Sequence, residues 1–309
     1  MLKIKIVYIK PTVKYRAMQE YKIENSVLEA TIKSTGAELI SLKKGETEYI
    51  WQADKSYWGR HAPVLFPIVG KLKNDKYNYA GKAYNLSQHG FARDQDFTLI
   101  SQSEDSISFS LKNNESIKKH YPFDFELRVT YFLRENKLAV KYEVFNTKEE
   151  ELLFSIGGHP AFNCPMEEGQ NRSEYVICLD DAHDVESKEL VNGAIGEKTR
   201  AVLENGQFLV IERDTFDKDA IIFDPNPFRK ATLIHRESEK EYLGVHFQGF
   251  PSLGLWSKNE ESPFVCIEPW FGIADYHLHD GELKNKRGII KLAKNEHFEC
   301  QYAIKVYKT

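Results

Sequence analysis

The sequence of 309 residues lacks several features that would assign it to common protein classes. Its four cysteines are scattered without any Cys-x-x-Cys spacing, which argues against a zinc ribbon and against a disulfide framework. No apolar run approaches the roughly 18 residues that a membrane-spanning helix needs. The first nine residues alternate apolar side chains with lysine, unlike a signal peptide. We therefore expect a cytoplasmic protein with reduced thiols and no membrane association.

Basic clusters and cofactor-binding loops are also missing. The formal net charge is −4, and no run of lysine or arginine forms a basic segment that could bind nucleic acid. The sequence contains neither a P-loop nor the glycine-rich loop of dinucleotide-binding folds. A Gly-x-Ser-x-Gly nucleophile motif is absent as well. These absences predict no cofactor, no nucleic-acid partner and no serine hydrolase chemistry.

Helical periodicity is scarce, whereas short segments of alternating apolar and polar residues recur along the whole chain. The best helix candidate is 116–120, preceded by Asn113 and Asn114 as possible caps and stopped by Pro122. The clearest hairpin joins 125–132 to 138–145, and both arms have one apolar and one polar face. Further strands are expected at 28–33, 37–42, 96–100, 106–111, 175–179, 208–211, 220–223, 231–234, 242–247, 253–256, 264–267 and 298–307.

Many short strands and few helices predict an all-β fold, a large antiparallel β-sandwich. With 41% hydrophobic residues and no Pro/Ser-rich linker, one large domain over residues 18–309 is favoured over two. Residues 1–17, rich in lysine and tyrosine, precede a second possible start at Met18. We interpret them as an N-terminal extension of uncertain order.

The most conspicuous stretch is Gly-Gly-His-Pro-Ala-Phe at 157–162, which closes an apolar strand-like run. Glycine allows a sharp turn and close approach of the backbone to a ligand, while proline fixes φ. The two together would hold the imidazole of His159 on a stiff bend, where it could give or take a proton near neutral pH. A tight turn whose histidine merely ends a strand is the structural alternative.

A second stretch, Glu-Pro-Trp at 268–270, places a carboxylate at the end of an apolar strand. Burial beside Pro269 and Trp270 would raise the pKa of Glu268 toward the working range of a general base. A sugar ring could stack on the indole of Trp270. We expect Pro269 to break the strand ladder. The alternative is an edge-strand glutamate in a salt bridge.

Two further stretches carry candidate ligand-binding groups. One is Gln-His-Gly-Phe-Ala-Arg at 88–93, with His89 and Arg93, and the other contains Arg60 just before a proline-broken apolar segment. The guanidinium of either arginine could donate two hydrogen bonds to vicinal hydroxyls or to a phosphate. Either arginine could instead form an ordinary surface ion pair. His277 and His279 would lie on one face of a strand, but no third and fourth ligand is evident beyond Asp275 and Asp280. No metal site is therefore predicted.

Taken in order, these four stretches resemble the aldose 1-epimerase (galactose mutarotase) family, in particular its LacX-like branch, from about Tyr21 to the C-terminus. The resemblance implies a galactose mutarotase-like β-sandwich with a sugar cleft and no cofactor. By resemblance, Glu268 is the catalytic base and His159 the catalytic acid. His89, Arg60 and Trp270 would contact the sugar. Asp219 resembles the substrate-binding aspartate, although Asp217 and Asp224 stand close to it.

The residue types suit this chemistry independently of the family. Opening a hemiacetal ring removes a proton from the anomeric hydroxyl while another proton reaches the ring oxygen, and one base and one acid suffice. We expect the imidazole to face the glutamate across a cleft about one sugar ring wide. The cationic Arg93, with Lys71 and Lys73 near in sequence, keeps a hexose 6-phosphate open as substrate.

Two other functions remain open at this stage. A non-catalytic carbohydrate-binding sandwich would need a cleft but not an acid and a base together. A glycoside hydrolase would need two carboxylates flanking the scissile bond, and Glu268 has no evident partner in the sequence. The sequence leaves a monomer and a homodimer equally open, with a small-molecule sugar as the expected partner.

Overall fold

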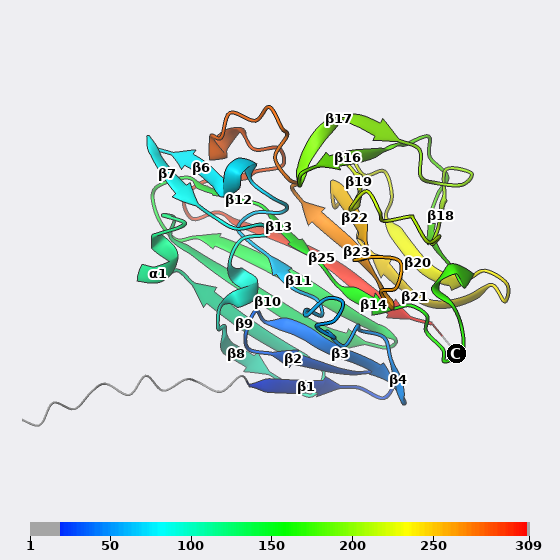
Figure 1. Cartoon of the computed structure of the whole chain (residues 1–309). Coiled ribbons are helices and arrows are strands. Elements are labelled where there is room, and N and C mark those ends of the chain that lie inside the picture. The colour runs from blue at the N-terminus through cyan, green and yellow to red at the C-terminus, as the bar shows by residue number, and fades with distance from the viewer. Residues whose placement is uncertain (1–18, 308–309) are drawn as a thin grey trace, which may run out of the picture.

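The computed structural model describes residues 19–307 and shows an all-β protein whose strand ladders are all antiparallel (Figure 1). The predicted extension, residues 1–17, lies outside the described residues.

The largest sheet has nine strands in the order β18 (Phe208–Val210), β15 (Tyr175–Leu179), β20 (Lys230–His235), β21 (Lys240–His246), β25 (His297–Val306), β11 (Lys137–Asn146), β10 (Phe125–Arg134), β9 (Ser106–Lys112) and β8 (Thr98–Gln102). The second sheet has eight strands in the order β17 (Ala194–Arg200), β16 (Ser187–Val191), β19 (Ile221–Phe223), β22 (Ser252–Trp256), β23 (Phe264–Phe271), β13 (Ile156–Gly158) and β5 (Val64–Leu65), with β14 (Ala161–Asn163) also paired to β23.

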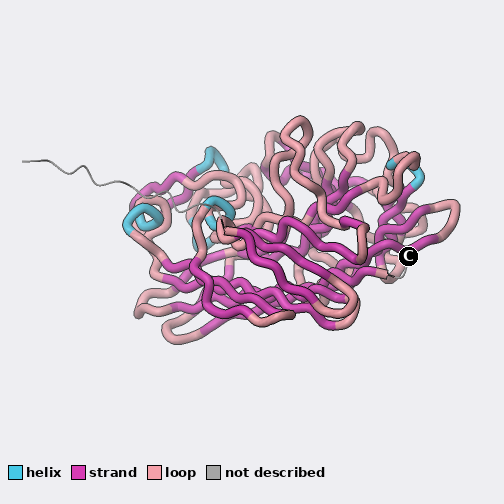
Figure 2. The backbone as a smooth tube through the Cα atoms, turned by 90° about the horizontal axis from the view of Figure 1, so that it is seen from below, coloured by secondary structure: helices cyan, strands magenta, loops and turns pink. Residues whose placement is uncertain are grey.

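Smaller sheets complete the fold. They are the four-stranded β1 (Glu20–Glu24), β2 (Glu29–Lys33), β3 (Glu38–Lys44) and β4 (Thr47–Glu48), and the pairs β6 (Lys76–Tyr79) with β7 (Lys82–Asn85) and β12 (Leu152–Phe154) with β24 (Ile290–Leu292). The helical elements are α1 (Glu115–Lys118) and the 3₁₀ turns η1 (Lys73–Asp75), η2 (Ala92–Asp94), η3 (Arg172–Glu174) and η4 (Leu283–Asn285). Figure 2 shows these short helices at the periphery of a body made of strands.

The two large sheets pack face to face, which confirms the predicted sandwich. One cluster of buried apolar side chains contains Leu255 and Ile267 from the eight-stranded sheet and Val245 and Ile304 from the nine-stranded sheet. The ring of Phe271 on β23 meets that of Phe298 on β25 edge to face, with centroids 5.0 Å apart. Aromatic pairs of this geometry add to the free energy gained by burying their area.

The predicted hairpin is confirmed, and two further predicted strands form a second hairpin. Strands β10 and β11 pair from Phe125 opposite Asn146 to Arg134 opposite Lys137, and β8 pairs with β9. The predicted helix is a single turn capped by Asn114, whose side chain accepts hydrogen bonds from the backbone N–H groups of Ser116 and Ile117. The hairpins β6–β7 and β16–β17 were not predicted from the sequence, because their strands are largely solvent-exposed and carry weak apolar alternation.

Pro269 does not end its strand, contrary to the prediction. Strand β23 continues to Phe271, with Pro269 opposite Leu253 of β22. On the other side of β23, the partner strands β14 and β13 are interrupted at residues 159–160, level with this part of the strand. A proline is tolerated where no ladder hydrogen bond requires its missing N–H.

The two glycines before His159 also differ from the prediction, since they form strand β13 rather than a turn. A Cβ atom on Gly157 would lie 2.6 Å from the Trp270 ring, and one on Gly158 would lie 2.9 Å from the Tyr302 ring. Real Cβ contacts are longer than this. The glycines therefore let aromatic rings approach both faces of the strand that leads to His159.

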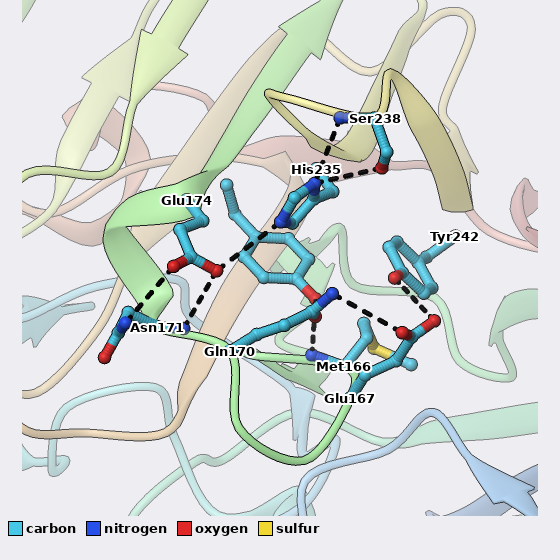
Figure 3. Close-up of polar contacts among 9 residues, drawn as sticks. Met166, Glu167, Gln170, Asn171, Glu174, His235, Ser238 and Tyr242 are labelled. Atoms are coloured by element: carbon cyan, nitrogen blue, oxygen red, sulfur yellow. Dashed lines mark hydrogen bonds and ion pairs between the residues drawn. The ribbon is translucent and has the colours of Figure 1, made fainter.

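Polar contacts tie together the loop between β14 and β15 (Figure 3). The loop is closed by the capping box of Asn171 and Glu174 and by the Tyr242 hydroxyl, which donates to Glu167 at 2.8 Å. From this loop Arg172 donates to the backbone oxygen of Asn259 at 2.6 Å. The loop thereby holds the turn that follows β22.

No helix in residues 19–307 is long and apolar enough to span a membrane.

Gly90 gives a test of backbone constraint in this fold. Its φ is +71°, and a Cβ atom there would lie 2.3 Å from the backbone oxygen of Phe66. We expect Gly90→Ala to lower the free energy of unfolding by about 3 kcal/mol in urea titrations. Gly81→Ala is the matched control, because Gly81 has φ +74° with nothing within 4 Å of such a Cβ. It should lose only about 1 kcal/mol. Equal losses in the two variants would contradict the steric argument.

Candidate active site

The central residue of the candidate site is His159, in the two-residue link between β13 and β14. Its backbone N–H donates to the backbone oxygen of Pro63 at 3.2 Å, and that of Ala161 donates to His61 at 2.9 Å. The link therefore runs alongside the segment that leads into β5. His159 is 7% exposed. The hydrogen bonds of its own backbone and of Ala161 fix the direction of its imidazole.

Glu268 reaches the same place from β23. It is 1% exposed, and its Oε2 atom lies 3.2 Å from Nε2 of His159. The contact is within ion-pair distance but lacks hydrogen-bond alignment, so Glu268 Oε2 is buried without a hydrogen-bond partner. The other ring nitrogen, His159 Nδ1, is also buried without a partner. The two groups touch on one side of the cleft. The prediction that they face each other across a space one sugar ring wide is wrong, because adjacent strands of one sheet carry them.

Burial drives both groups toward their neutral forms. It lowers the pKa of His159 to about 3, and the charges of Arg93 and Arg60 contribute to this shift. Burial also raises the pKa of Glu268 well above its usual value, with a further contribution from Asp219. At a pH between the pKa values of the two groups, the pair holds a single proton. Because the groups are closely coupled, each titration step belongs to the pair and not to one residue. At a pH between the two pKa values, the site thus contains one proton donor and one proton acceptor.

Aromatic side chains enclose the imidazole. Trp58 stacks on His159 with ring centroids 4.8 Å apart and planes at 25°, and Trp256 meets it edge to face at 5.7 Å. Trp270, from β23, lies against the glycines of β13 and β22: a Cβ on Gly254 would be 2.3 Å from its ring. These rings exclude water from the pair and offer flat apolar surfaces of the kind on which sugar rings stack.

His89 lies beside His159, with ring centroids 5.6 Å apart. The backbone N–H of Gly70 donates to His89 Nδ1 at 3.2 Å, which leaves the ring proton of the neutral imidazole on Nε2. Burial, with the neighbouring His159, holds the pKa of His89 well below its usual value. His89 has φ +66°, a left-handed conformation that is costly for a residue other than glycine. Nε2 of this neutral ring lies 3.2 Å from Nε2 of Gln88, so the side-chain amide of Gln88 already occupies that position.

These groups line one cleft of about 400 Å³. His159, Glu268, His89, Arg93, Asp219 and Trp270, all of them predicted, are among its lining residues. Arg60 lies outside this lining and pairs with Asp94, with Nη2 and Oδ1 2.9 Å apart. Its charge acts on the site from a distance, because it contributes to lowering the pKa values of His89, His159 and Arg93.

The cleft lining also includes charged side chains. The Arg93 side chain is only 16% exposed, and its Nη2 donates to the backbone oxygen of Gln88 at 2.7 Å. Lys71 and Lys258 also line the cleft, as does the exposed carboxylate of Asp219. Asp219, predicted by resemblance to bind the substrate, thus places a second carboxylate near Glu268. Arg93, Lys71 and Lys258 outnumber this one exposed carboxylate, so these charged lining groups carry a net positive charge.

Several lining residues were missed by sequence reasoning: Trp58, Gln88, Leu190, Asn192, Gly193, Trp256 and Lys258. Asn192 and Gly193 form the turn of the β16–β17 hairpin, with φ +54° and +80°. An Asn-Gly turn signal between two runs could have revealed this hairpin. Trp256 and Lys258 carry no local signal, because their place in the cleft depends on strand order.

The predicted arrangement of His277 and His279 on one strand face is wrong. Tyr276 forms an isolated bridge, and the chain turns at His277 and Leu278. His279 contacts Asp275, with Nδ1 and Oδ2 3.5 Å apart, whereas His277 lies near Glu197. The period of two applies only to extended backbone, so the turn separates the two imidazoles.

The chain thus combines an antiparallel β-sandwich with a buried imidazole–carboxyl pair in a polar and aromatic cleft. Residues 19–291 match the family model described as aldose 1-epimerase. The chain belongs to the aldose 1-epimerase family. Family and fold together support an isomerase with a mutarotase-type function.

Individual relatives agree with this assignment. The chain is 35% identical over 298 residues to the plasmid-encoded protein LacX of Lactococcus lactis subsp. lactis, covering 92% of this chain and 98% of LacX. The structure of a galactose mutarotase related enzyme from Lactobacillus acidophilus superposes with a TM-score of 0.88 at 37% identity, covering 94% and 98% of the two chains. A putative glucose-6-phosphate 1-epimerase of Escherichia coli is 29% identical over 133 residues, which is 38% of this chain and 42% of that protein.

Burial of a neutral His159 makes a prediction about stability and pH. The folded pKa of about 3 is below the usual 6.5, so on acidification the unfolded chain binds this proton first and stability is lost. Between pH 6.5 and 4.5 the wild type should lose about 2 kcal/mol more than His159→Asn. Chemical denaturation at several pH values measures this difference. Parallel curves for the two proteins would show that His159 is not held neutral.

Proposed function

We propose that the protein is an aldose 1-epimerase that interconverts the α and β anomers of an aldohexose, with Glu268 as general base and His159 as general acid. The observation that carries this proposal is the buried contact of 3.2 Å between His159 Nε2 and Glu268 Oε2 in the cleft. The anomeric oxygen and the ring oxygen are bonded to the same carbon. An acid and a base that touch each other can therefore reach both oxygens at once.

The reaction needs only the one proton that the pair holds. In the reactive form Glu268 is a carboxylate and His159 is protonated. This form arises from the neutral pair when the carboxyl proton of Glu268 moves to the imidazole of His159. Glu268 takes the proton of the anomeric hydroxyl while His159 gives its proton to the ring oxygen, and the bond between C1 and that oxygen breaks. Rotation about C1–C2 and closure by the reverse transfers give the other anomer.

Other cleft residues would bind and orient the sugar. The buried Glu268 Oε2, which has no hydrogen-bond partner, would be satisfied by a sugar hydroxyl. The neutral His89 can donate from Nε2 where a sugar hydroxyl replaces the Gln88 amide, and Asp219 can accept a hydroxyl proton. Trp58 and Trp270 supply apolar surface. The aromatic enclosure strengthens each proton transfer, because water does not screen the charges inside it.

The proposal predicts that Glu268→Gln and His159→Asn each slow mutarotation by about 10²–10⁴-fold, because each removes one positioned proton transfer. The assay is the decay of optical rotation of fresh α-glucose or α-galactose. His277→Asn is the control, since its imidazole is 38% exposed and lies in a turn outside the cleft.

Wild-type rates in both cleft variants would refute this assignment of roles. Sugar binding without acceleration over buffer would favour a non-catalytic carbohydrate-binding protein. Release of reducing sugar from a glycoside would favour hydrolysis by Glu268 and Asp219 instead.

A hexose 6-phosphate is a second candidate substrate, favoured by the cations of the cleft. Arg93 is largely buried at the cleft, and burial lowers its pKa only to about 10, so it keeps its charge at neutral pH. A guanidinium pairs well with phosphate, and Arg93 Nε has no hydrogen-bond partner, its nearest carboxylate oxygen being Oδ2 of Asp94 at 3.8 Å. The name of the Escherichia coli relative points to the same substrate class.

This alternative predicts that Arg93→Gln raises KM for glucose 6-phosphate by about tenfold and changes KM for glucose much less. Coupled or polarimetric mutarotation assays with both sugars measure the two effects. Arg229→Gln is the matched control, because Arg229 pairs with Asp180 on the surface of the other sheet. Equal effects on both sugars would reject a phosphate contact and leave the neutral hexose as substrate.

A further inference from the structure

Cys266 lies beside the proposed acid and base but has no part in sugar chemistry. It precedes Glu268 by two residues on β23, so both side chains point to the same face of the sheet. On the neighbouring strand it stands opposite Ala161, two residues after His159. The thiol is fully buried. The register of β14 on β23 thus brings a thiol, an imidazole and a carboxylate together.

These three side chains offer zinc ligands at nearly the right separation. One ligand atom from each of His159, Cys266 and Glu268 lies within 4.8 Å of the others. Tetrahedral zinc with bonds of about 2.0–2.3 Å holds its ligand atoms about 3.3–3.6 Å apart. Nε2 of His159 and Oε2 of Glu268 are already at 3.2 Å. A shift of about 1 Å would bring the sulfur into place.

One ligand atom also has unused bonding capacity. Glu268 Oε2 is buried without a hydrogen-bond partner, and the whole residue is only 1% exposed. A divalent cation with one thiolate and one carboxylate forms a site without net charge, which a buried position tolerates. Burial raises the pKa of the free Cys266 thiol, with a contribution from Glu268, but a bound cation displaces the thiol proton to solvent.

We propose that His159, Cys266 and Glu268 form a site for Zn²⁺ that overlaps the sugar site. Cys266 lies behind the cleft lining, whereas the other two ligands face into it. The fourth tetrahedral position therefore opens to the cleft and takes a water molecule. A thiolate and an imidazole select a borderline-soft cation, so Mg²⁺ and Ca²⁺ do not compete.

Occupation by zinc and catalysis exclude each other. The cation uses the carboxylate as a ligand, so Glu268 can no longer accept a proton, and His159 can no longer deliver one. Zinc is then an inhibitor competitive with the sugar. This consequence rests on the proposed epimerase function, whereas metal binding itself does not.

The binding test uses the purified full chain without a polyhistidine tag, titrated with Co²⁺ as a spectroscopic substitute for Zn²⁺. We expect thiolate-to-cobalt charge-transfer absorption in the near ultraviolet, displaced by Zn²⁺ and unaffected by Mg²⁺. Cys266→Ala should abolish this band, and Glu268→Gln should weaken cobalt binding by about tenfold or more. Cys178→Ala is the matched control, since Cys178 is a half-buried thiol on β15 in the other sheet and should leave the band unchanged.

The second readout is mutarotation in the presence of Zn²⁺. Inhibition of the wild type should be relieved by raising the sugar concentration, and Cys266→Ala should need about tenfold more zinc for the same inhibition. No cobalt–thiolate band in the wild type, or the same band in Cys266→Ala, overturns the proposal. A band in a protein without mutarotase activity would support the metal site and reject the epimerase function, so the two failures can be told apart.

Discussion

The contact between the His159 imidazole and the Glu268 carboxyl is the constraint on which the rest of the site depends. Ionising either group alone at its buried position would be costly. A single proton, held by either group, leaves the pair without net charge. The cost of ionisation falls when the two opposite charges are in contact. A pair held in this way is ready to exchange protons with a ligand that brings its own hydroxyl groups into the cleft.

The scaffold holds this contact by close packing rather than by a flexible bend. His159 follows a strand whose glycines admit Trp270 on one face and Tyr302 on the other. Glu268 lies on a strand that continues through a proline, opposite the gap between β14 and β13. The aromatic rings that fill these spaces leave little freedom for either backbone. The positions of the acid and the base are consequences of the core.

Sequence reasoning succeeded where the signal is local. The hairpin of β10 and β11, the cap at Asn114 and the all-β class follow from alternation and turn residues, which depend on the residues themselves and their immediate neighbours. It failed where neighbouring elements decide the outcome. A proline ends a strand in one setting and is accommodated within a strand in another. The spacing of His277 and His279 places both side chains on one face only if the backbone is extended there. Neither question has an answer within one segment.

The sequence by itself determined the kinds of residue available for chemistry and the strands that carry them: an imidazole after a glycine-rich strand, a carboxylate within an apolar one, and a second histidine beside a glycine. Only the tertiary structure decided that the first two touch, that Arg60 turns to Asp94 while Arg93 lines the cleft, and that Trp58, Trp256 and Cys266 surround the pair. The physical reason is that antiparallel pairing sets these distances through strand order and register. Those properties arise from packing among residues that are far apart along the chain.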